Sequence, residues 1–161
     1  MRLREFAELD LPEFAHYRAM PEVARYQSWE NYTLEDARRL YTAQLGMAFG
    51  TAGSWHQVAI ADKATDTLIG DCALHFLEGE ELEIGFTLAP ERQGRGLAKE
   101  SVGLLLDHMR RSRVLAVTDA KNLAAQKLLL ALRFQKQAER DVIFKGTDGK
   151  EFDFVRNSAS S

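Results

Sequence analysis

The sequence predicts one α/β domain built around a mixed sheet. The chain has 161 residues, which is the length of a single ordinary domain. An apolar share of 45% and a charged share of 28% indicate a globular protein with a buried core rather than a disordered chain. The hydrophobic period changes from helical spacing to strand-like alternation at Trp55, and both periods recur downstream. Strands and helices are therefore expected to share one sheet-based domain.

The first 54 residues predict a short strand and two helices. Residues 3–6 form a short edge strand. Asp10 followed by Pro12 is typical of a helix start, with the aspartate as the cap, and this helix ends near Met20. Thr33 begins a second helix, and a loop follows at 50–54. The apolar stripe of the second helix consists of Ala37, Leu40, Tyr41, Leu45 and Ala48.

Three strands are predicted in the middle of the chain, at 55–61, 68–76 and 82–88. Pro90 ends the third strand. Alternation puts the apolar residues of the third strand on one face and its small and polar residues on the other. The first face carries Leu82, Ile84, Phe86 and Leu88, and the second carries Glu83, Gly85 and Thr87.

The last third predicts a helix, a strand, a second helix and a hairpin. The first helix begins after the glycines at 94–96, the strand covers 113–118, and the second helix covers 122–132. Two strands at 134–145 and 151–156 are joined at Thr147–Gly149, where Asp-Gly is typical of a hairpin turn. The domain therefore covers residues 1–156, and residues 157–161 form a polar tail.

Composition excludes several classes of protein. Cys72 is the one cysteine, so an intrachain disulfide and a cysteine-only metal site are impossible; the four histidines lack ligand spacing, and no metal is expected. Residues 1–11 have no signal-peptide core, and no run of 18 apolar residues could cross a membrane. A net charge of −3 is too acidic for a dedicated nucleic-acid binder. We therefore expect a cytoplasmic domain with neither nucleic acid nor membrane as partner.

Charge is distributed unevenly along the chain. Residues 1–90 carry seven Lys or Arg and fifteen Asp or Glu, a net charge of −8, whereas residues 91–161 carry a net charge of +5. An acidic first part and a basic second part suit a protein that binds a cation with one and an anion with the other. The alternative is an ordinary fluctuation of charge along a chain.

The segment Arg92–Lys99 carries the strongest chemical signal. It follows a strand and opens a helix, so its two glycines allow a tight turn that points N–H groups at one place. The helix N-terminus adds partial positive charge there, and Arg92, Arg95 and Lys99 add full charges. The combination suits a phosphate or pyrophosphate, and the alternative is a plain glycine turn.

Two other phosphate loops fit this segment poorly. The Walker string G-x-x-x-x-G-K-[ST] is absent. The dinucleotide fingerprint needs Gly or Ala where Lys99 stands, and the five residues between Leu88 and Gly94 are too many for its tight first turn. Asp119, at the end of the next strand, favours the dinucleotide interpretation, which therefore stays open.

The order of several motifs resembles a known family. Gln93–Ala98 resembles the Q/R-x-x-G-x-G/A pyrophosphate loop of the GNAT superfamily of acetyl-CoA-dependent N-acetyltransferases. Four further segments are similar to its RimJ/RimL-like branch, and the motifs together cover roughly residues 2–156. They are the "EIGY" strand at Leu82–Phe86, the "GxAxEA" helix start at Gly96–Ser101, the "NxxS…LGF" segment within Asn122–Phe134 and the "PEVxRY" stretch at Pro21–Tyr26.

The resemblance implies a fold and an activity. The family's sheet is mixed and mostly antiparallel, splays open after the fourth strand, carries helices on both faces and holds CoA in the opening. The implied reaction moves acetyl from acetyl-CoA, the co-substrate, to a primary amine by direct attack in a ternary complex. The implied acceptor is a small-molecule or peptide amine, such as a protein N-terminus, and the protein is expected to be a monomer or a homodimer.

The resemblance also implies which residues bind acetyl-CoA. Asn122 would bond the pantetheine and Lys127 could reach the nucleotide end; the alternatives are a helix cap for Asn122 and a solvated charge for Lys127. Backbone groups of Phe86, Thr87 and Leu88 would pair with the acetyl-pantetheine arm. The pyrophosphate loop would consist of Arg92, Gln93, Gly94, Arg95, Gly96, Leu97, Ala98 and Lys99.

The acceptor side is less defined. Tyr26, Trp29 and Tyr32 fall in the segment that walls the family's acceptor site, and the alternative is that they close the core. An amine arrives mainly as a cation, because its pKa is about 8 for an α-amine and about 10.4 for a lysine-type amine. A carboxylate can take that proton, and Glu83 stands where the family often places a base. The alternative for Glu83 is an ion pair with a buried arginine or a bond to a neighbouring strand.

Three positions depart from the family pattern. Leu129 stands where many relatives carry the tyrosine that protonates the leaving thiolate. Ala125 replaces the RimJ/RimL serine, and Arg133 replaces the usual glycine before Phe134. The general acid is therefore unidentified, and a CoA-binding sensor or scaffold without turnover is the alternative function.

Overall fold

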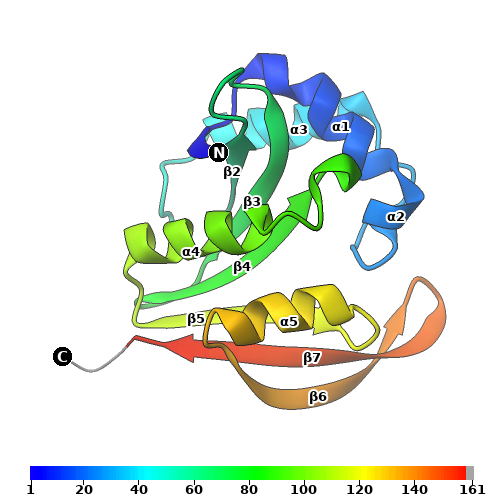
Figure 1. Cartoon of the computed structure of the whole chain (residues 1–161), viewed down its shortest axis with the longest axis vertical. Coiled ribbons are helices and arrows are strands. Elements are labelled where there is room, and N and C mark those ends of the chain that lie inside the picture. Colours follow the sequence, from blue (N-terminus) through cyan, green and yellow to red (C-terminus); the bar gives the residue numbers. More distant parts are fainter. Residues whose placement is uncertain (159–161) are drawn as a thin grey trace.

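A seven-stranded sheet runs through the middle of the molecule between two groups of helices (Figure 1). The computed structural model describes residues 1–158. The strands are β1 (Arg2–Glu5), β2 (Trp55–Ala61), β3 (Leu68–Phe76), β4 (Glu81–Leu88), β5 (Arg113–Asp119), β6 (Gln135–Phe144) and β7 (Thr147–Asn157). The helices are α1 (Leu11–Ala19), α2 (Pro21–Ala24), α3 (Leu34–Leu45), α4 (Leu97–Met109) and α5 (Leu123–Ala131).

The sheet separates between β4 and β5. Its order is β1-β2-β3-β4-β5-β7-β6, and every neighbouring pair is antiparallel except β4 and β5, which are parallel. These two strands pair only from Glu81 opposite Arg113 to Glu83 opposite Leu115. Beyond these residues they diverge, and we call the opening between 84–88 and 116–119 the notch. The predicted mixed, mostly antiparallel sheet that splays after the fourth strand is confirmed.

The two faces of the sheet are covered by different helices. In β2, Val58 and Ile60 belong to a core cluster shared with α4 and α5, whereas Ala59 between them belongs to a cluster shared with α1 and α3. Successive side chains of a strand point to opposite faces, so the two clusters lie on opposite sides. Phe14 of α1 is fully buried, and burying such a ring contributes about 1.5–3 kcal/mol. Cys72 is buried, and burial raises the pKa of its thiol.

The two predicted helix starts have different outcomes. Thr33 caps α3 as predicted: its hydroxyl accepts from the Asp36 N–H at 3.1 Å, and its own N–H donates to the Asp36 carboxylate at 2.9 Å. Helix α1 begins at Leu11, with Asp10 at its N-cap position and Pro12 in its first turn as predicted, but the Asp10 side chain makes no cap hydrogen bond, and that part of the prediction is wrong. The Asp10 carboxylate instead accepts two hydrogen bonds from Arg4, at 2.7 and 2.8 Å, and one from the Ala7 N–H. The arginine is a stronger competitor because it supplies both charge and two donors.

Other helix and turn positions also differ from the prediction. The helix α3 ends at Leu45, so Ala48 lies beyond it, and α2 was not predicted because four residues are too short for a periodic signal. The last hairpin turns at Lys145–Gly146, where φ is +49° and +79°. Positive φ at both central residues is typical of a two-residue hairpin turn. The predicted turn at Thr147–Gly149 is therefore wrong, since these residues pair with Val142–Phe144 inside the hairpin.

Residue 157 is the last of β7, and residues 159–161 of the predicted tail lie outside the described part of the chain. Within residues 1–158, no helix is long and apolar enough to span a membrane. In the same range, no three or more His, Cys, Asp or Glu side chains gather closely enough to hold a metal ion.

Candidate active site

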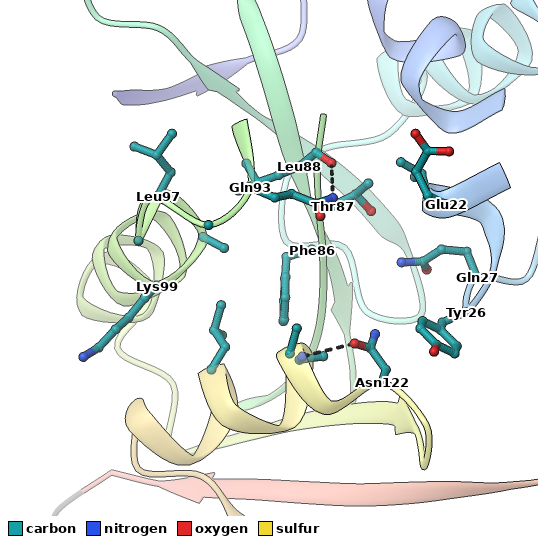
Figure 2. Close-up of a pocket in the computed structure, with 17 residues that line it drawn as sticks. Glu22, Tyr26, Gln27, Phe86, Thr87, Leu88, Gln93, Leu97, Lys99 and Asn122 are labelled. Atoms are coloured by element: carbon teal, nitrogen blue, oxygen red, sulfur yellow. Dashed lines mark hydrogen bonds between the residues drawn. The ribbon is translucent and has the colours of Figure 1, made fainter. Parts of the chain in front are cut away.

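A cavity of about 400 Å³ lies at the mouth of the notch, where α2, β4, the start of α4 and α5 meet (Figure 2). Each of these elements contributes a few side chains or backbone groups to its wall. The lining residues are Glu22, Val23, Tyr26, Gln27, Phe86, Thr87, Leu88, Gln93, Gly94, Gly96, Leu97, Ala98, Lys99, Asn122, Ala124, Ala125 and Leu128. The structure therefore brings together most of the residues expected to bind the donor, from three separate parts of the chain.

The glycine loop forms one wall of this cavity. Gly94 and Gly96 have φ of +77° and +75°, a conformation that L side chains rarely adopt. A Cβ at either position would meet nothing within 4 Å, so the neighbouring space is open. The Gln93 side chain donates to the Leu88 carbonyl at 3.1 Å and holds the loop against the end of β4. Helix α4 begins at Leu97, so its first N–H groups and partial positive charge lie at the cavity.

The basic residues of the loop point in different directions. Lys99 lines the cavity, whereas Arg92 forms an ion pair with Asp62 at 3.3 Å. Arg95 and Lys127 are exposed and are absent from the lining. The cavity therefore receives partial positive charge from backbone N–H groups, since Figure 2 shows the Lys99 ammonium pointing away from the other labelled lining residues, and the part assigned to Arg92, Arg95, Lys99 and Lys127 stays a prediction.

Asn122 faces the cavity and also caps a helix. Its side-chain oxygen accepts from the Ala125 N–H at 3.1 Å at the start of α5. Figure 2 shows its amide nitrogen pointing away from that bond, on the open side of the pocket. The expected pantetheine contact and the alternative cap use different atoms of this side chain, so one does not exclude the other.

A second cavity, of about 70 Å³, lies deeper in the notch. Its walls are 84–86 of β4, 116–119 of β5, and Ala125 and Leu129 of α5. Tyr26 and Gln27 line both cavities, and the Tyr26 hydroxyl donates to the Lys121 carbonyl at 3.3 Å. The segment after α2 is thereby joined to the loop before α5 across the mouth of the notch.

Glu83 lies at the closed end of the notch, in the last residue pair between β4 and β5. Its Oε2 is 3.3 Å from Nδ1 of His75, its neighbour on β3. In the tautomer that carries its proton on Nδ1, the His75 ring donates a hydrogen bond to this carboxylate oxygen. Trp55 of β2 stacks on His75, with ring centroids 4.3 Å apart and planes 10° apart. The Glu83 side chain is 29% exposed, so water and solutes reach it.

Trp29 and Tyr32 are placed away from both cavities. Their rings pack around the guanidinium of Arg18, which lies 4.0 Å from the Trp29 ring centre and forms a buried ion pair with Asp71 at 3.1 Å. Tyr17 also donates to Asp71, and burial and that carboxylate raise the pKa of Tyr17 well above its ordinary value. Of the three aromatic residues expected at the acceptor wall, Tyr26 lines these two cavities, and Trp29 and Tyr32 line neither.

One contact near the site had no signal in the sequence. The ammonium of Lys145, at the tip of the β6–β7 hairpin, donates to the carbonyls of Ala24 at 2.8 Å and Trp29 at 2.7 Å. It therefore ties the segment that carries Tyr26 to a hairpin more than 100 residues further along the chain. Only the folded position of the hairpin brings these groups together.

An open mixed sheet, with a glycine loop and a helix N-terminus beside two separating parallel strands, defines a domain of the acetyltransferase class. The chain belongs to the acetyltransferase (GNAT) domain family, whose family model matches residues 1–135. The family predicted from the motifs is confirmed, and the chain is an acetyltransferase by family.

Relatives and solved structures agree with this assignment. The uncharacterized N-acetyltransferase p20 of Bacillus licheniformis is 29% identical over 144 residues, which are 85% of this chain and 80% of the relative. The structure of spermidine N-acetyltransferase from Vibrio cholerae, in complex with CoA and spermine, matches with a TM-score of 0.85 at 18% identity, over 98% of this chain and 95% of that chain. RimL, a ribosomal L7/L12 alpha-N-protein acetyltransferase in complex with CoA, matches with a TM-score of 0.84 at 16% identity, over 96% and 92%. At these identities the solved structures show the shared fold.

Proposed function

We propose that this acetyltransferase moves acetyl from acetyl-CoA to a primary amine by direct attack in a ternary complex. The observation that carries the proposal is the arrangement along β4. The glycine loop lies at one end of the strand, the cavities lie along its unpaired edge, and the Glu83 carboxylate stands where the edge closes. Donor and acceptor would meet at that closed end.

The residues present fit the donor. The N–H groups of Gly94–Ala98, with Lys99, would hold the pyrophosphate, because the loop is open to approach and the helix N-terminus favours an anion. Backbone groups of 86–88 and the Asn122 amide would pair with the pantetheine arm. When bound, acetyl-CoA supplies an activated acetyl thioester. Its reactive end would lie in the 70 Å³ cavity, whose walls combine apolar side chains of β4, β5 and α5 with several polar groups.

Glu83 would prepare the acceptor. The incoming amine is a cation at neutral pH and must lose a proton before its nitrogen can attack a carbonyl carbon. Glu83 would accept that proton, directly or through water, while His75 holds the carboxylate in place. The net charge of −8 in residues 1–90 favours the approach of a cationic acceptor. The solved relatives named for spermidine and for a ribosomal protein support amines of both the small-molecule and the peptide kind as candidates.

A second candidate function is a CoA-binding sensor or scaffold without turnover. Leu129 favours it, because this buried apolar side chain stands where similar enzymes carry a tyrosine acid. Calorimetry with acetyl-CoA tests the donor site common to both functions, and absence of binding at millimolar ligand contradicts both. A thiol-release assay over a panel of amines then separates them. The panel contains an N-terminal peptide, a free amino acid, a polyamine and an aminoglycoside. Binding without CoA release favours the sensor.

A further inference from the structure

Thr118 carries a hydroxyl with no partner at the wall of the notch. The residue is 7% exposed, and its Oγ1 is buried without a hydrogen-bond partner among the described residues. Buried side-chain hydroxyls nearly always have a partner, so this group needs an explanation. Thr118 lines the 70 Å³ cavity between β4 and β5, which offers the hydroxyl a place for a ligand atom.

The strand register places Thr118 opposite the expected path of the donor. Glu83 and Leu115 form the last pair of β4 and β5, and Phe86 and Thr118 are each the third residue after that pair. They therefore stand at the same depth on opposite sides of the notch. Thr118 alternates with the buried Val114 and Ala116, so its side chain points to the face that α5 covers. A pantetheine arm on residues 86–88 would bring its thioester end to this depth or deeper.

The other polar side chains of this cavity are mostly engaged elsewhere. The Tyr26 hydroxyl donates to the Lys121 carbonyl, and the Asn122 oxygen caps α5. The Asp119 carboxylate, which with Tyr26 is a titratable group of the lining, accepts from the Lys121 N–H. Leu129, at the position of the missing tyrosine, offers no donor. Thr118 is thus a buried donor without a partner among the described residues, in a cavity whose titratable groups, Tyr26 and Asp119, are already hydrogen-bonded.

We propose that the Thr118 hydroxyl donates a hydrogen bond to the sulfur atom of acetyl-CoA as the thioester breaks; this rests on the proposed function. The amine nitrogen attacks the carbonyl carbon and forms the N–C bond. The C–S bond then breaks, the sulfur leaves with the bonding electron pair as a thiolate, and the proton of the amine goes to Glu83. An ordinary thiol has a pKa of about 8.5, so the departing sulfur tolerates negative charge near neutral pH. It needs a hydrogen bond more than a proton, and Thr118 keeps its proton throughout.

Two substitutions test the proposal. Thr118→Val keeps the shape and removes the hydroxyl, and Thr118→Ser keeps the hydroxyl. Because Thr118→Val loses one hydrogen bond to a charged atom, it should lower kcat by roughly 10- to 100-fold. The affinity for acetyl-CoA measured by calorimetry should not change. Thr118→Ser should restore most of kcat. Because the hydroxyl has no partner within residues 1–158, Thr118→Val should leave the melting temperature equal or higher.

A measurement without turnover gives a second readout. The ultraviolet absorbance of the thiolate, followed against pH in the complex with CoA, reports the pKa of the bound thiol. Thr118→Val should raise that pKa by about one unit for each tenfold loss in kcat. Wild-type kcat and an unchanged thiol pKa in Thr118→Val would overturn the proposal, as would a lower melting temperature that serine restores without restoring kcat. Failure of the wild-type protein to bind CoA overturns the proposed function as well. If CoA binds without turnover, the thiol pKa alone decides the role of Thr118.

Discussion

Glu83 and His75 meet across neighbouring strands, with 3.3 Å between the carboxylate Oε2 and the ring Nδ1. The contact lies at the point where β4 and β5 stop pairing, and it holds a partly buried carboxylate in one orientation. This contact is compatible with two roles for Glu83: a general base held in position by His75, or a purely structural link between strands. Mutations of the two partners distinguish these roles.

Glu83→Gln should slow acetyl transfer without weakening the binding of acetyl-CoA. The substitution keeps the shape but removes the proton acceptor, and loss of a general base costs about 100- to 10,000-fold in kcat. The loss should shrink as the pH rises, because free amine becomes abundant. Steady-state kinetics against pH, with Glu80→Gln as an exposed control on the preceding turn, measure the effect. A normal kcat with a lower melting temperature would assign Glu83 to structure alone.

His75→Phe should lower kcat about tenfold by removing the hydrogen bond to the carboxylate while keeping a ring for Trp55 to stack on. The affinity for acetyl-CoA should not change, because His75 lines neither cavity. In a Glu83→Gln background the same substitution should have little further effect, since the two residues act as a unit. Independent, additive losses in the double variant would contradict the positioning role.

Gly94→Leu should weaken binding of acetyl-CoA at least about tenfold, because a side chain would stand where N–H groups approach a charged phosphate. The positive φ also makes any side chain there costly, by roughly 1–2 kcal/mol. Gly50→Leu is the matched control, since Gly50 has φ of +87° and equally open surroundings but lies away from the cavities. Calorimetry on both variants separates the two effects, and equal affinities would mean that the loop is only a turn.

Asp10 should make stability depend on pH at the acidic end. Burial alone would raise the pKa of Asp10, but hydrogen bonds from Arg4 and the Ala7 N–H outweigh it and hold the pKa below its ordinary value of 3.8. A carboxyl group whose pKa is lower in the folded state stabilises the protein at pH values above its pKa in the unfolded state. This contribution is lost as the pH falls through the folded-state pKa. Asp10→Asn should therefore lower the free energy of unfolding by about 1–3 kcal/mol at neutral pH.

The difference between wild type and Asp10→Asn should disappear as the pH falls from about 5 toward 2 in urea titrations. Asp66→Asn is the control, because Asp66 contacts the same Arg4 but is 55% exposed and should contribute little. A difference that persists unchanged at low pH would show that the charge of Asp10 does not stabilise the fold.

Local signals in the sequence predicted the strands and the start of α3 well. Both signals depend on residues close together in the chain. The strand at 82–88 shows alternating apolar and polar residues, and the start of α3 is fixed by the reciprocal hydrogen bonds of Thr33 and Asp36. The last hairpin was misplaced because two adjacent segments suit a turn, Lys145–Gly146 and Asp148–Gly149. The register of the β6–β7 hairpin then depends on how β7 pairs with β5, and the local sequence around the turn does not show that pairing.

The candidate site also combines features that the local sequence predicts with features that only the folded structure shows. The glycine loop and the cap at Asn122 are local features, and the sequence predicted both positions. The contacts of His75 with Glu83 and of Lys145 with the segment after α2 need the strand order and the hairpin position. The resemblance to the family indicated where a base stands, but not which neighbour holds it. The unpartnered hydroxyl of Thr118 is visible only once the notch exists in three dimensions.

The central claim is direct transfer of acetyl to an amine, and one experiment tests it most directly. The wild-type protein is incubated with acetyl-CoA, with and without each amine of the panel, while CoA release and the masses of protein and amine are followed. Direct attack predicts CoA release only when an accepting amine is present, one added acetyl group on that amine, and unmodified protein. Acetyl-CoA that binds but is never consumed with any amine, or protein that itself becomes acetylated before the amine is added, would contradict the account.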